Sequence, residues 1–108
     1  SIPSGNFGNL SAGVLAQRMG LPVQAFVAST NLNNVVPSFL TSGTYQPMDS
    51  VATISNAMDV GNPSNFVRLS RLYNDDLATI RRYVAGYYFT DEQTRDGMRD
   101  LFARHNYV

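Results

Sequence analysis

The sequence contains no cysteine and only one histidine, His105, and all eight of its basic residues are arginine, so lysine is absent as well. The lack of cysteine excludes disulfides, thiolate metal ligands and a cysteine nucleophile. A single histidine excludes a metal site built from several imidazoles. These absences remove metal centres and thiol chemistry from the expected functions, and we expect no metal ligands.

Charge is also scarce, because only 15% of the residues are charged and eight acidic residues balance the eight arginines. A net charge of zero lacks the basic footprint of a nucleic-acid-binding protein or of a basic protein on a membrane surface. No apolar run is long enough to cross a bilayer. We therefore expect neither nucleic acid nor a membrane as a partner.

The length of 108 residues allows one small domain, 1–108, and the hydrophobic share of 44% is typical of a folded chain. Within it, residues 1–20 are expected to form a loop and its following helix, and residues 21–108 the remainder. The chain does not begin with methionine, and no strand is expected to fit in front of Pro3. We expect a piece of a longer protein; a processed small protein is the alternative.

Hydrophobic spacing and turn residues predict alternating helices and strands. Helices are expected over 9–19, from Asn33 or Asn34 to Gly43, over 62–73, from 74 to about 84, and over 91–104. Short strands are expected over 23–28, 51–54 and 87–89. This order predicts an α/β fold with a sheet of about three strands flanked by about five helices. So small a sheet leaves a face or an edge uncovered.

Several local signals support these helices. Asn62-Pro63 is typical of a helix start, and Thr90 with Gln93 is typical of a capping box. One apolar face of the first helix is expected from Leu10, Val14, Leu15 and Met19. The core side of the last helix is expected to carry Met98, Leu101 and Phe102.

The segment most suggestive of chemistry is Ser4-Gly5-Asn6-Phe7-Gly8-Asn9, which leads directly into the first helix. Its glycines let the backbone approach a ligand closely, and the helix start leaves N–H groups unpaired beside a partial positive charge. Such a loop suits a phosphate, with polar contacts from Ser4 and Asn6. An ordinary glycine-rich turn explains the spacing equally well. The motif is neither a nucleotide P-loop nor a dinucleotide fingerprint.

The sequence of this loop, from Pro3 to Asn9, resembles the phosphate loop of fold-type II pyridoxal-phosphate enzymes, which are similar to the tryptophan synthase β chain. Further stretches resemble the threonine synthase family of bacteria and fungi. They are the segments 28–33, 36–40, 55–60, 62–66 and 98–101. The resemblance covers essentially the whole chain, in order.

The resemblance implies a lyase that acts on a carbon–oxygen bond of a phosphate ester, converting O-phosphohomoserine and water to threonine and phosphate in the cytoplasm. It implies pyridoxal 5'-phosphate as the cofactor, bound by Ser4, Gly5, Asn6, Phe7, Gly8 and Asn9. In that family a lysine upstream of the loop holds the cofactor. Because this chain has no lysine, no catalytic residue is carried over, and we expect a central fragment that is inactive alone.

Other polar residues allow more than one interpretation. Asn56, Asp59 and Asn65 could line an active-site cleft, but turn formation is favoured, and the same holds for Asn31, Asn33 and Asn34. The pairs Asp75–Asp76 and Asp91–Glu92 are interpreted as helix caps rather than metal ligands. Four arginines are interpreted as solvated helix faces or weak ion pairs, although one that binds a substrate phosphate is an alternative: Arg68, Arg71, Arg81 and Arg82. His105 is interpreted as a cation near a helix end rather than a catalytic histidine. Tyr87 and Tyr88 are interpreted as sheet packing rather than as residues that stack on a cofactor.

Two other classes of function remain open. One is a non-catalytic module that binds phosphate through the loop. The other is a structural domain that self-associates through its uncovered sheet edge.

Overall fold

The computed structural model describes residues 1–107, and Val108 lies outside the described part. Its sheet has three parallel strands in the order β1-β2-β3, with β1 at Ile2–Pro3, β2 at Phe26–Thr30 and β3 at Val84–Tyr88. Five α-helices accompany it, so the expected α/β fold with three strands and five helices is confirmed.

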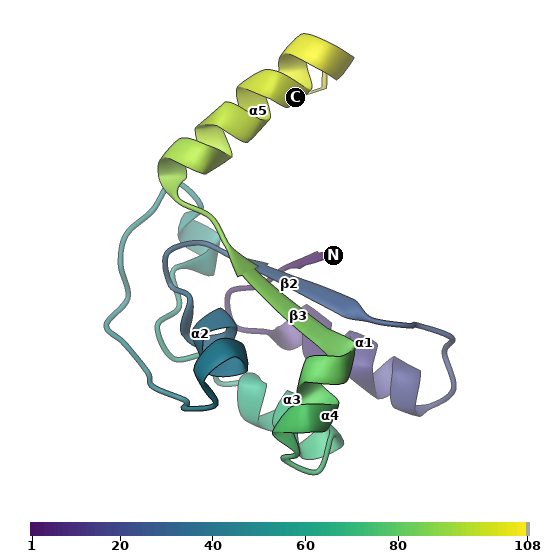
Figure 1. Ribbon diagram of the computed structural model, residues 1–108. Coiled ribbons are helices and arrows are strands. Elements are labelled where there is room, and N and C mark those ends of the chain that lie inside the picture. The colour runs from purple at the N-terminus through teal and green to yellow at the C-terminus, as the bar shows by residue number, and fades with distance from the viewer. Residues whose placement is uncertain (108) are drawn as a thin grey trace.

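The helices lie between the strands along the chain and after the last strand (Figure 1). Helix α1 (Gly8–Arg18) connects β1 to β2, and α2 (Val35–Ser42), α3 (Phe66–Leu72) and α4 (Leu77–Tyr83) lie between β2 and β3. A 3-10 turn, η1 (Asn56–Met58), precedes α3, and α5 (Asp91–His105) follows β3. Helices α1 to α4 lie on one side of the sheet, whereas α5 extends away from it (Figure 1).

The core lies between the sheet and helices α1 to α4. Alternation along β2 buries Phe26, Ala28 and Thr30 and leaves the residues between them partly exposed, as a sheet covered on one face requires. The largest fully buried side chains come from α1, α2, α3, α4 and β3; they are Leu10, Val14, Val36, Leu69, Ile80 and Val84. This packing fixes the end of β1 and the start of α1, which together carry the glycine-bearing loop.

The strand predictions differ from the structure in several places, and the strand expected over 23–28 is found at Phe26–Thr30. A strand does precede the loop: Ile2 and Pro3 pair with Ala28 and Ser29 of β2. The segment 51–54 is not a strand, because side chains from elsewhere, rather than a neighbouring strand, bind its backbone. The third strand begins at Val84, earlier than expected, directly after α4.

Helix boundaries also differ from expectation at two places. Helix α3 begins at Phe66 and not at the Asn-Pro pair, whose proline carbonyl instead accepts a bond from the Phe66 amide. Asn74 and Asp75 adopt left-handed backbone conformations, so they form a turn and α4 starts only after Asp76. The predicted stop of α2 is confirmed, since Gly43 ends that helix at a φ of 81°.

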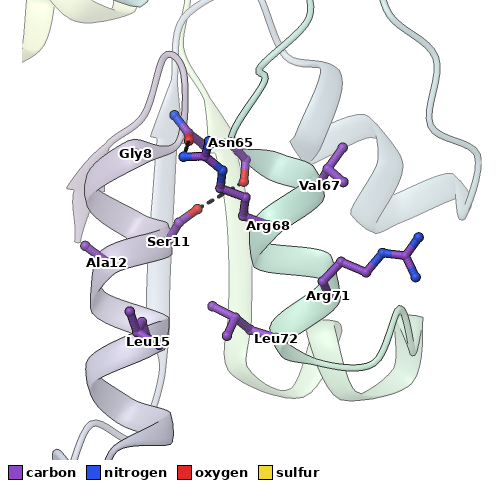
Figure 2. Close-up of a pocket in the computed structure, with 9 residues that line it drawn as sticks. All are labelled: Gly8, Ser11, Ala12, Leu15, Asn65, Val67, Arg68, Arg71 and Leu72. Carbon is purple, nitrogen blue, oxygen red and sulfur yellow. Dashed lines mark hydrogen bonds between the residues drawn. The ribbon is translucent and has the colours of Figure 1, made fainter.

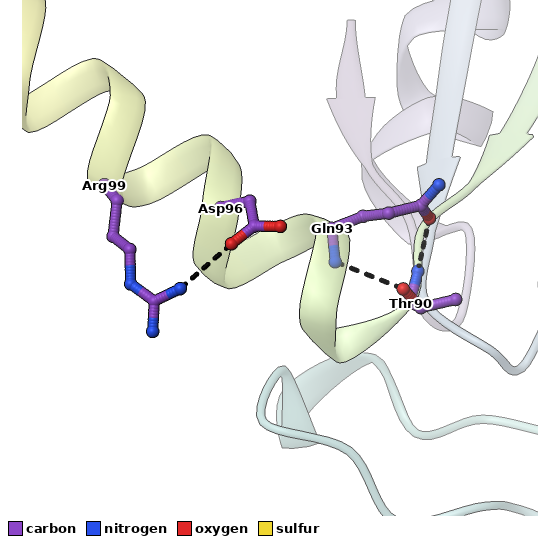
Figure 3. A network of polar contacts seen from close by, with 4 residues as sticks. All are labelled: Thr90, Gln93, Asp96 and Arg99. Carbon is purple, nitrogen blue, oxygen red and sulfur yellow. Dashed lines mark hydrogen bonds and ion pairs between the residues drawn. The ribbon is translucent and has the colours of Figure 1, made fainter.

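The start of α5 is held as the sequence predicts (Figure 3). The Gln93 amide donates to the Thr90 hydroxyl at 3.2 Å, and the Gln93 side chain accepts from the Thr90 amide at 2.9 Å. One turn further on, Arg99 pairs with Asp96 at 2.9 Å. The capping box is therefore confirmed, and α5 owes its start to local bonds.

The expected core side of α5 is wrong. Met98, Leu101 and Phe102 are 55%, 42% and 54% exposed, because no described element packs against this helix. The predicted face of α1 is wrong in part as well. Leu10 and Val14 are buried, but Leu15 and Met19 are largely exposed.

Candidate phosphate-binding loop

The loop joins the carboxyl end of β1 to helix α1. Its first residue continues the sheet pairing, because the Ser4 amide donates to the Ser29 carbonyl at 2.8 Å. Phe7 then takes a left-handed conformation, with a φ of 62°, and caps α1 through its backbone alone. The buried Phe7 ring meets Phe66 of α3 edge-on, with ring centroids 6.1 Å apart. A strand, an aromatic anchor and a helix start therefore fix the two ends of the loop.

The backbone amides of the loop are the groups best placed to bind a ligand. Within residues 1–107, none of the amides from Gly5 to Leu10 donates to a protein acceptor. These amides border a hollow of about 160 Å³ lined by residues 3–10. The N-terminal end of α1 adds partial positive charge to the same place. The arrangement offers several adjacent N–H donors to one small anion.

The loop side chains are less available than the backbone. Ser4 is buried, and its hydroxyl donates to the Ile2 carbonyl at 2.9 Å. The Asn6 side-chain oxygen accepts from the Ser64 amide at 2.6 Å and from the Ser64 hydroxyl at 3.0 Å. Asn9 is exposed at the start of α1. An anion in the hollow would thus be bound chiefly by backbone amides. Ser64 helps to hold the loop through its bonds to Asn6, a role that the sequence did not reveal.

Gly5 is required by a close approach between two segments. A methyl group on Gly5 would lie 2.8 Å from the Met58 Cα and 3.1 Å from the Ala57 carbonyl oxygen. Both of these atoms belong to backbone and cannot rotate away. The glycine therefore lets η1 pack directly on the loop.

We expect Gly5→Ala to destabilise the protein by about 1–3 kcal/mol, because the new methyl must push the loop and η1 apart. Urea unfolding followed by circular dichroism measures this. Gly97→Ala is the matched control, since no described atom lies within 4 Å of a methyl group added at that position in α5. It should raise helix stability by about 0.5–1 kcal/mol. Equal stability of Gly5→Ala and the parent chain would contradict the close approach.

The asparagine-rich segment after β2 forms a buried polar network. Asn31 and Asn33 are only 3% and 4% exposed. The Asn31 side chain donates to Thr53 at 2.8 Å and to Asp59 at 2.7 Å, and its oxygen accepts from the Asn33 amide at 2.9 Å. Asn33 exchanges hydrogen bonds with the Val51 backbone at 2.8 and 2.9 Å. The network fastens segment 51–59 to the end of β2, beside the loop.

The three residues considered as cleft candidates have different surroundings. Asp59 belongs to the network and also accepts from the Thr53 amide at 3.0 Å. The Asn65 side chain accepts from Arg68 at 2.9 Å, and its carbonyl accepts from the Ser11 hydroxyl at 3.1 Å. Asn56 is exposed at the start of η1. Asp59 and Asn65 thus hold neighbouring segments together in this structure.

The pKa of Asp59 reflects two opposing causes. Burial disfavours the charged form and tends to raise the pKa, whereas hydrogen bonds from Thr53 and Asn31 favour the carboxylate. The bonds prevail, and the pKa is lowered from its ordinary value of 3.8. A carboxyl with a lowered pKa contributes stability that is present above its unfolded pKa and is lost as the pH falls through its folded pKa.

We therefore expect the free energy of unfolding to fall as the pH drops below about 4, and Asp59→Asn to weaken this fall. Urea midpoints measured between pH 7 and pH 2 test it. Part of the decrease in unfolding free energy at low pH should remain in Asp59→Asn, because the pKa of Asp76 is also lowered, by bonds from Thr79. The exposed control Asp96→Asn should keep all of it. An unchanged acid profile in Asp59→Asn would count against the network.

The remaining candidates lie apart from the loop. Asp76 accepts from the Thr79 amide at 2.9 Å as the cap of α4, and Asp75 pairs with Arg71 at 2.8 Å. The Asp91 carboxylate accepts from the Ile54 amide at 3.2 Å. The expected role at a helix start is therefore confirmed for Asp76, which caps α4, and for Asp91 and Glu92, which lie in the first turn of α5. It is wrong for Asp75, which lies in the turn before α4 in a left-handed conformation.

The other basic and aromatic candidates also make structural contacts or face outward. Arg81 donates to the Leu40 carbonyl at 2.6 Å, and Arg82 lies over the Tyr83 ring. His105 is exposed in the last turn of α5. Tyr87 and Tyr88 are 55% and 50% exposed, so the expectation that they pack within the sheet is wrong in this structure.

A larger cavity of about 580 Å³ lies between α1 and α3 (Figure 2). Its wall is mainly apolar, and Arg68 and Arg71 stand on the α3 side. The lining residues are Gly8, Ser11, Ala12, Leu15, Asn65, Val67, Arg68, Arg71 and Leu72. This cavity is larger than the hollow at the loop but lacks its run of consecutive free amides, so the loop is the better site for a phosphate.

Comparisons with known proteins place this geometry in context. No family model matches the chain. A threonine synthase of Serratia marcescens is 50% identical over 101 residues, which cover 94% of this chain and 23% of the relative. The crystal structure of threonine synthase from Escherichia coli superposes with a TM-score of 0.88 at 44% identity, covering 95% of this chain and 24% of that one.

A second similar structure was determined with a ligand bound to that protein. The threonine synthase of Brucella melitensis, determined with PLP bound, has a TM-score of 0.88 and 26% identity, and the match covers 98% of this chain and 28% of that one. The chain thus spans about a quarter of the length of the relatives it matches.

Proposed function

Because the chain belongs to the threonine synthase family and matches about a quarter of its relatives' length, we propose that it supplies the cofactor-phosphate loop of such an enzyme. The whole protein would be a pyridoxal-phosphate-dependent lyase of threonine biosynthesis, working in the cytoplasm on O-phosphohomoserine. The observation that carries the proposal is the run of amides from Gly5 to Leu10, which have no acceptor among residues 1–107 and surround a hollow of about 160 Å³.

The residues of the loop fit the phosphate group of pyridoxal 5'-phosphate. Amides from Gly5 to Asn9 would donate to its oxygens, and the start of α1 would stabilise its negative charge. Ser4 and Phe7 would hold the loop on the sheet and on α3. When bound, the cofactor supplies a ring that withdraws electrons from the substrate.

The chain's own contribution is to bind and orient, because it contains no lysine. A lysine that holds the cofactor would come from sequence outside this chain. We therefore expect no sustained release of phosphate when the 108-residue chain is mixed with pyridoxal phosphate and O-phosphohomoserine. Turnover by the chain alone would contradict this part of the proposal.

Binding to the loop can be tested directly on the ¹⁵N-labelled chain by NMR. Pyridoxal phosphate and inorganic phosphate should shift the amide signals of residues 5–10, whereas pyridoxal, which lacks the phosphate ester, should not. Shifts of equal size with pyridoxal, or shifts confined to other residues, would contradict a phosphate site at the loop.

A charge substitution sharpens the test. Asn9→Asp places a carboxylate beside the expected dianion, and we expect it to weaken binding of pyridoxal phosphate by about tenfold through repulsion. The same change favours the helix start, so stability should not fall. Gln24→Glu is the matched control, because Gln24 is exposed before β2, at the opposite end of the strands from the loop. It should leave the affinity unchanged.

A second candidate function is self-association of the isolated chain. It is favoured by the exposed apolar side chains on β3 and α5, which include Tyr87, Met98 and Phe102. Sedimentation velocity over a range of concentrations measures it. A monomer at every concentration would contradict this candidate without affecting the loop.

A further inference from the structure

The conformation of the loop depends on contacts from outside it. Hydrogen bonds between backbone groups hold Ser4 and Ser11, but within the described residues the amides between them have no protein acceptor. Phe7 lies in a left-handed conformation that non-glycine residues seldom adopt. A loop with so few internal bonds needs neighbours to stay in one shape.

Those neighbours come from one segment, residues 57–66. The backbone of Met58 packs on Gly5, and the Phe66 ring packs on Phe7. Between these two contacts, the Asn6 side-chain oxygen accepts from both the amide and the hydroxyl of Ser64. The two residues of this pair are 58 positions apart in the sequence.

The Asn6–Ser64 pair differs from the two packing contacts because it is directional. Two donors converge on one oxygen, at 2.6 and 3.0 Å, and this fixes the position of Asn6 relative to the start of α3. Asn6 is the central residue of the turn between Ser4 and Gly8, so its position sets where the neighbouring amides lie. A displacement of about 1 Å in a binding group is enough to cost substantial affinity or rate.

We propose that Asn6 and Ser64 form a latch that sets the loop's amides for phosphate, which makes Ser64 a positioning residue for the cofactor. The inference rests on the proposed function of the loop. It deepens that function by assigning a role to a residue that the loop motif itself does not contain. In this role the side-chain oxygen of Asn6 is bonded to Ser64, and its backbone amide remains to bind the ligand.

The test compares variants of the 108-residue chain in two measurements, ¹⁵N relaxation of the free protein and titration with pyridoxal phosphate. Asn6→Ala removes the acceptor, so residues 5–9 should become more mobile on the picosecond-to-nanosecond timescale. The affinity for pyridoxal phosphate should fall about tenfold. Ser64→Ala keeps the amide donor and should lose about twofold to threefold, whereas Ser64→Thr keeps both donors and should match the parent chain.

Asn56→Ala is the matched control, because Asn56 is exposed on η1 and no side-chain bond involves it in the described structure. It should change neither measurement, and circular dichroism confirms that each variant is folded. An ordered loop in Asn6→Ala overturns the latch. So does a mobile loop that retains full affinity.

The latch and the proposed function can fail separately. If the parent chain does not bind pyridoxal phosphate, the proposed function fails, and the relaxation measurement alone still decides the latch. If the parent chain binds and Asn6→Ala is equally ordered and equally tight, only the latch fails.

Discussion

Replacing Asn31 by alanine is expected to destabilise the protein by about 2–4 kcal/mol. The substitution removes donors to Thr53 and to the Asp59 carboxylate and removes the acceptor for the Asn33 amide. Asn33 then stays buried, and Thr53 and Asp59 stay partly buried, without these bonds, which costs more than the loss of an exposed hydrogen bond. Urea unfolding at neutral pH measures the change.

Asn34→Ala is the control for this prediction. Asn34 stands at the start of α2, but its side chain makes no capping bond there. We expect its removal to change stability by no more than about 0.5 kcal/mol. Similar losses in Asn31→Ala and Asn34→Ala would show that the network around Asp59 does not stabilise the fold.

Replacing Leu69 by alanine should cost about 2–5 kcal/mol, because it leaves a cavity where the side chain is now fully buried between α3 and the rest of the core. Val67→Ala tests the same helix on its outer face, where Val67 is 58% exposed. That change should cost less than about 1 kcal/mol, since little buried surface is lost and alanine favours the helix.

Thermal and urea unfolding of both variants measure this contrast. Because α3 also carries Phe66, which packs on Phe7, Leu69→Ala should reduce the order of the loop as well. A loss in Leu69→Ala no larger than that in Val67→Ala would mean that α3 does not belong to the core.

Local signals predicted part of the fold well. The capping box of α5 depends only on Thr90 and Gln93, which are three residues apart, and Gly43 ends α2 through its own backbone preference. The glycine-bearing loop before α1 is equally local. Such features are visible in a sequence because the interacting groups are close along the chain.

Features that depend on distant partners were missed. Strand β1 has only two residues, and it is a strand solely because Ile2 and Pro3 pair with β2. Segment 51–54 has the composition of a strand, but its backbone amides donate to the side chains of Asn33 and Asp59 instead of to a neighbouring strand. Neither outcome can be deduced from periodicity.

Apolar periodicity also failed as a measure of burial on α5. Met98, Leu101 and Phe102 have the spacing of a core face, yet no described element covers them. Periodicity shows that a helix has an apolar side but not that a neighbour exists to bury it. For the candidate site, the sequence indicated the loop, whereas Ser64 came to light only through the tertiary contacts.

The long separation between Asn6 and Ser64 has a consequence for biosynthesis. Residues 4–9 leave the ribosome well before α3 does, and at a typical elongation rate the delay is on the order of 3–12 seconds. During that interval the nascent segment lacks the partners that shape it. If the loop binds phosphate as proposed, it would therefore reach its binding conformation only after the residues of α3 have been synthesised and have folded against it.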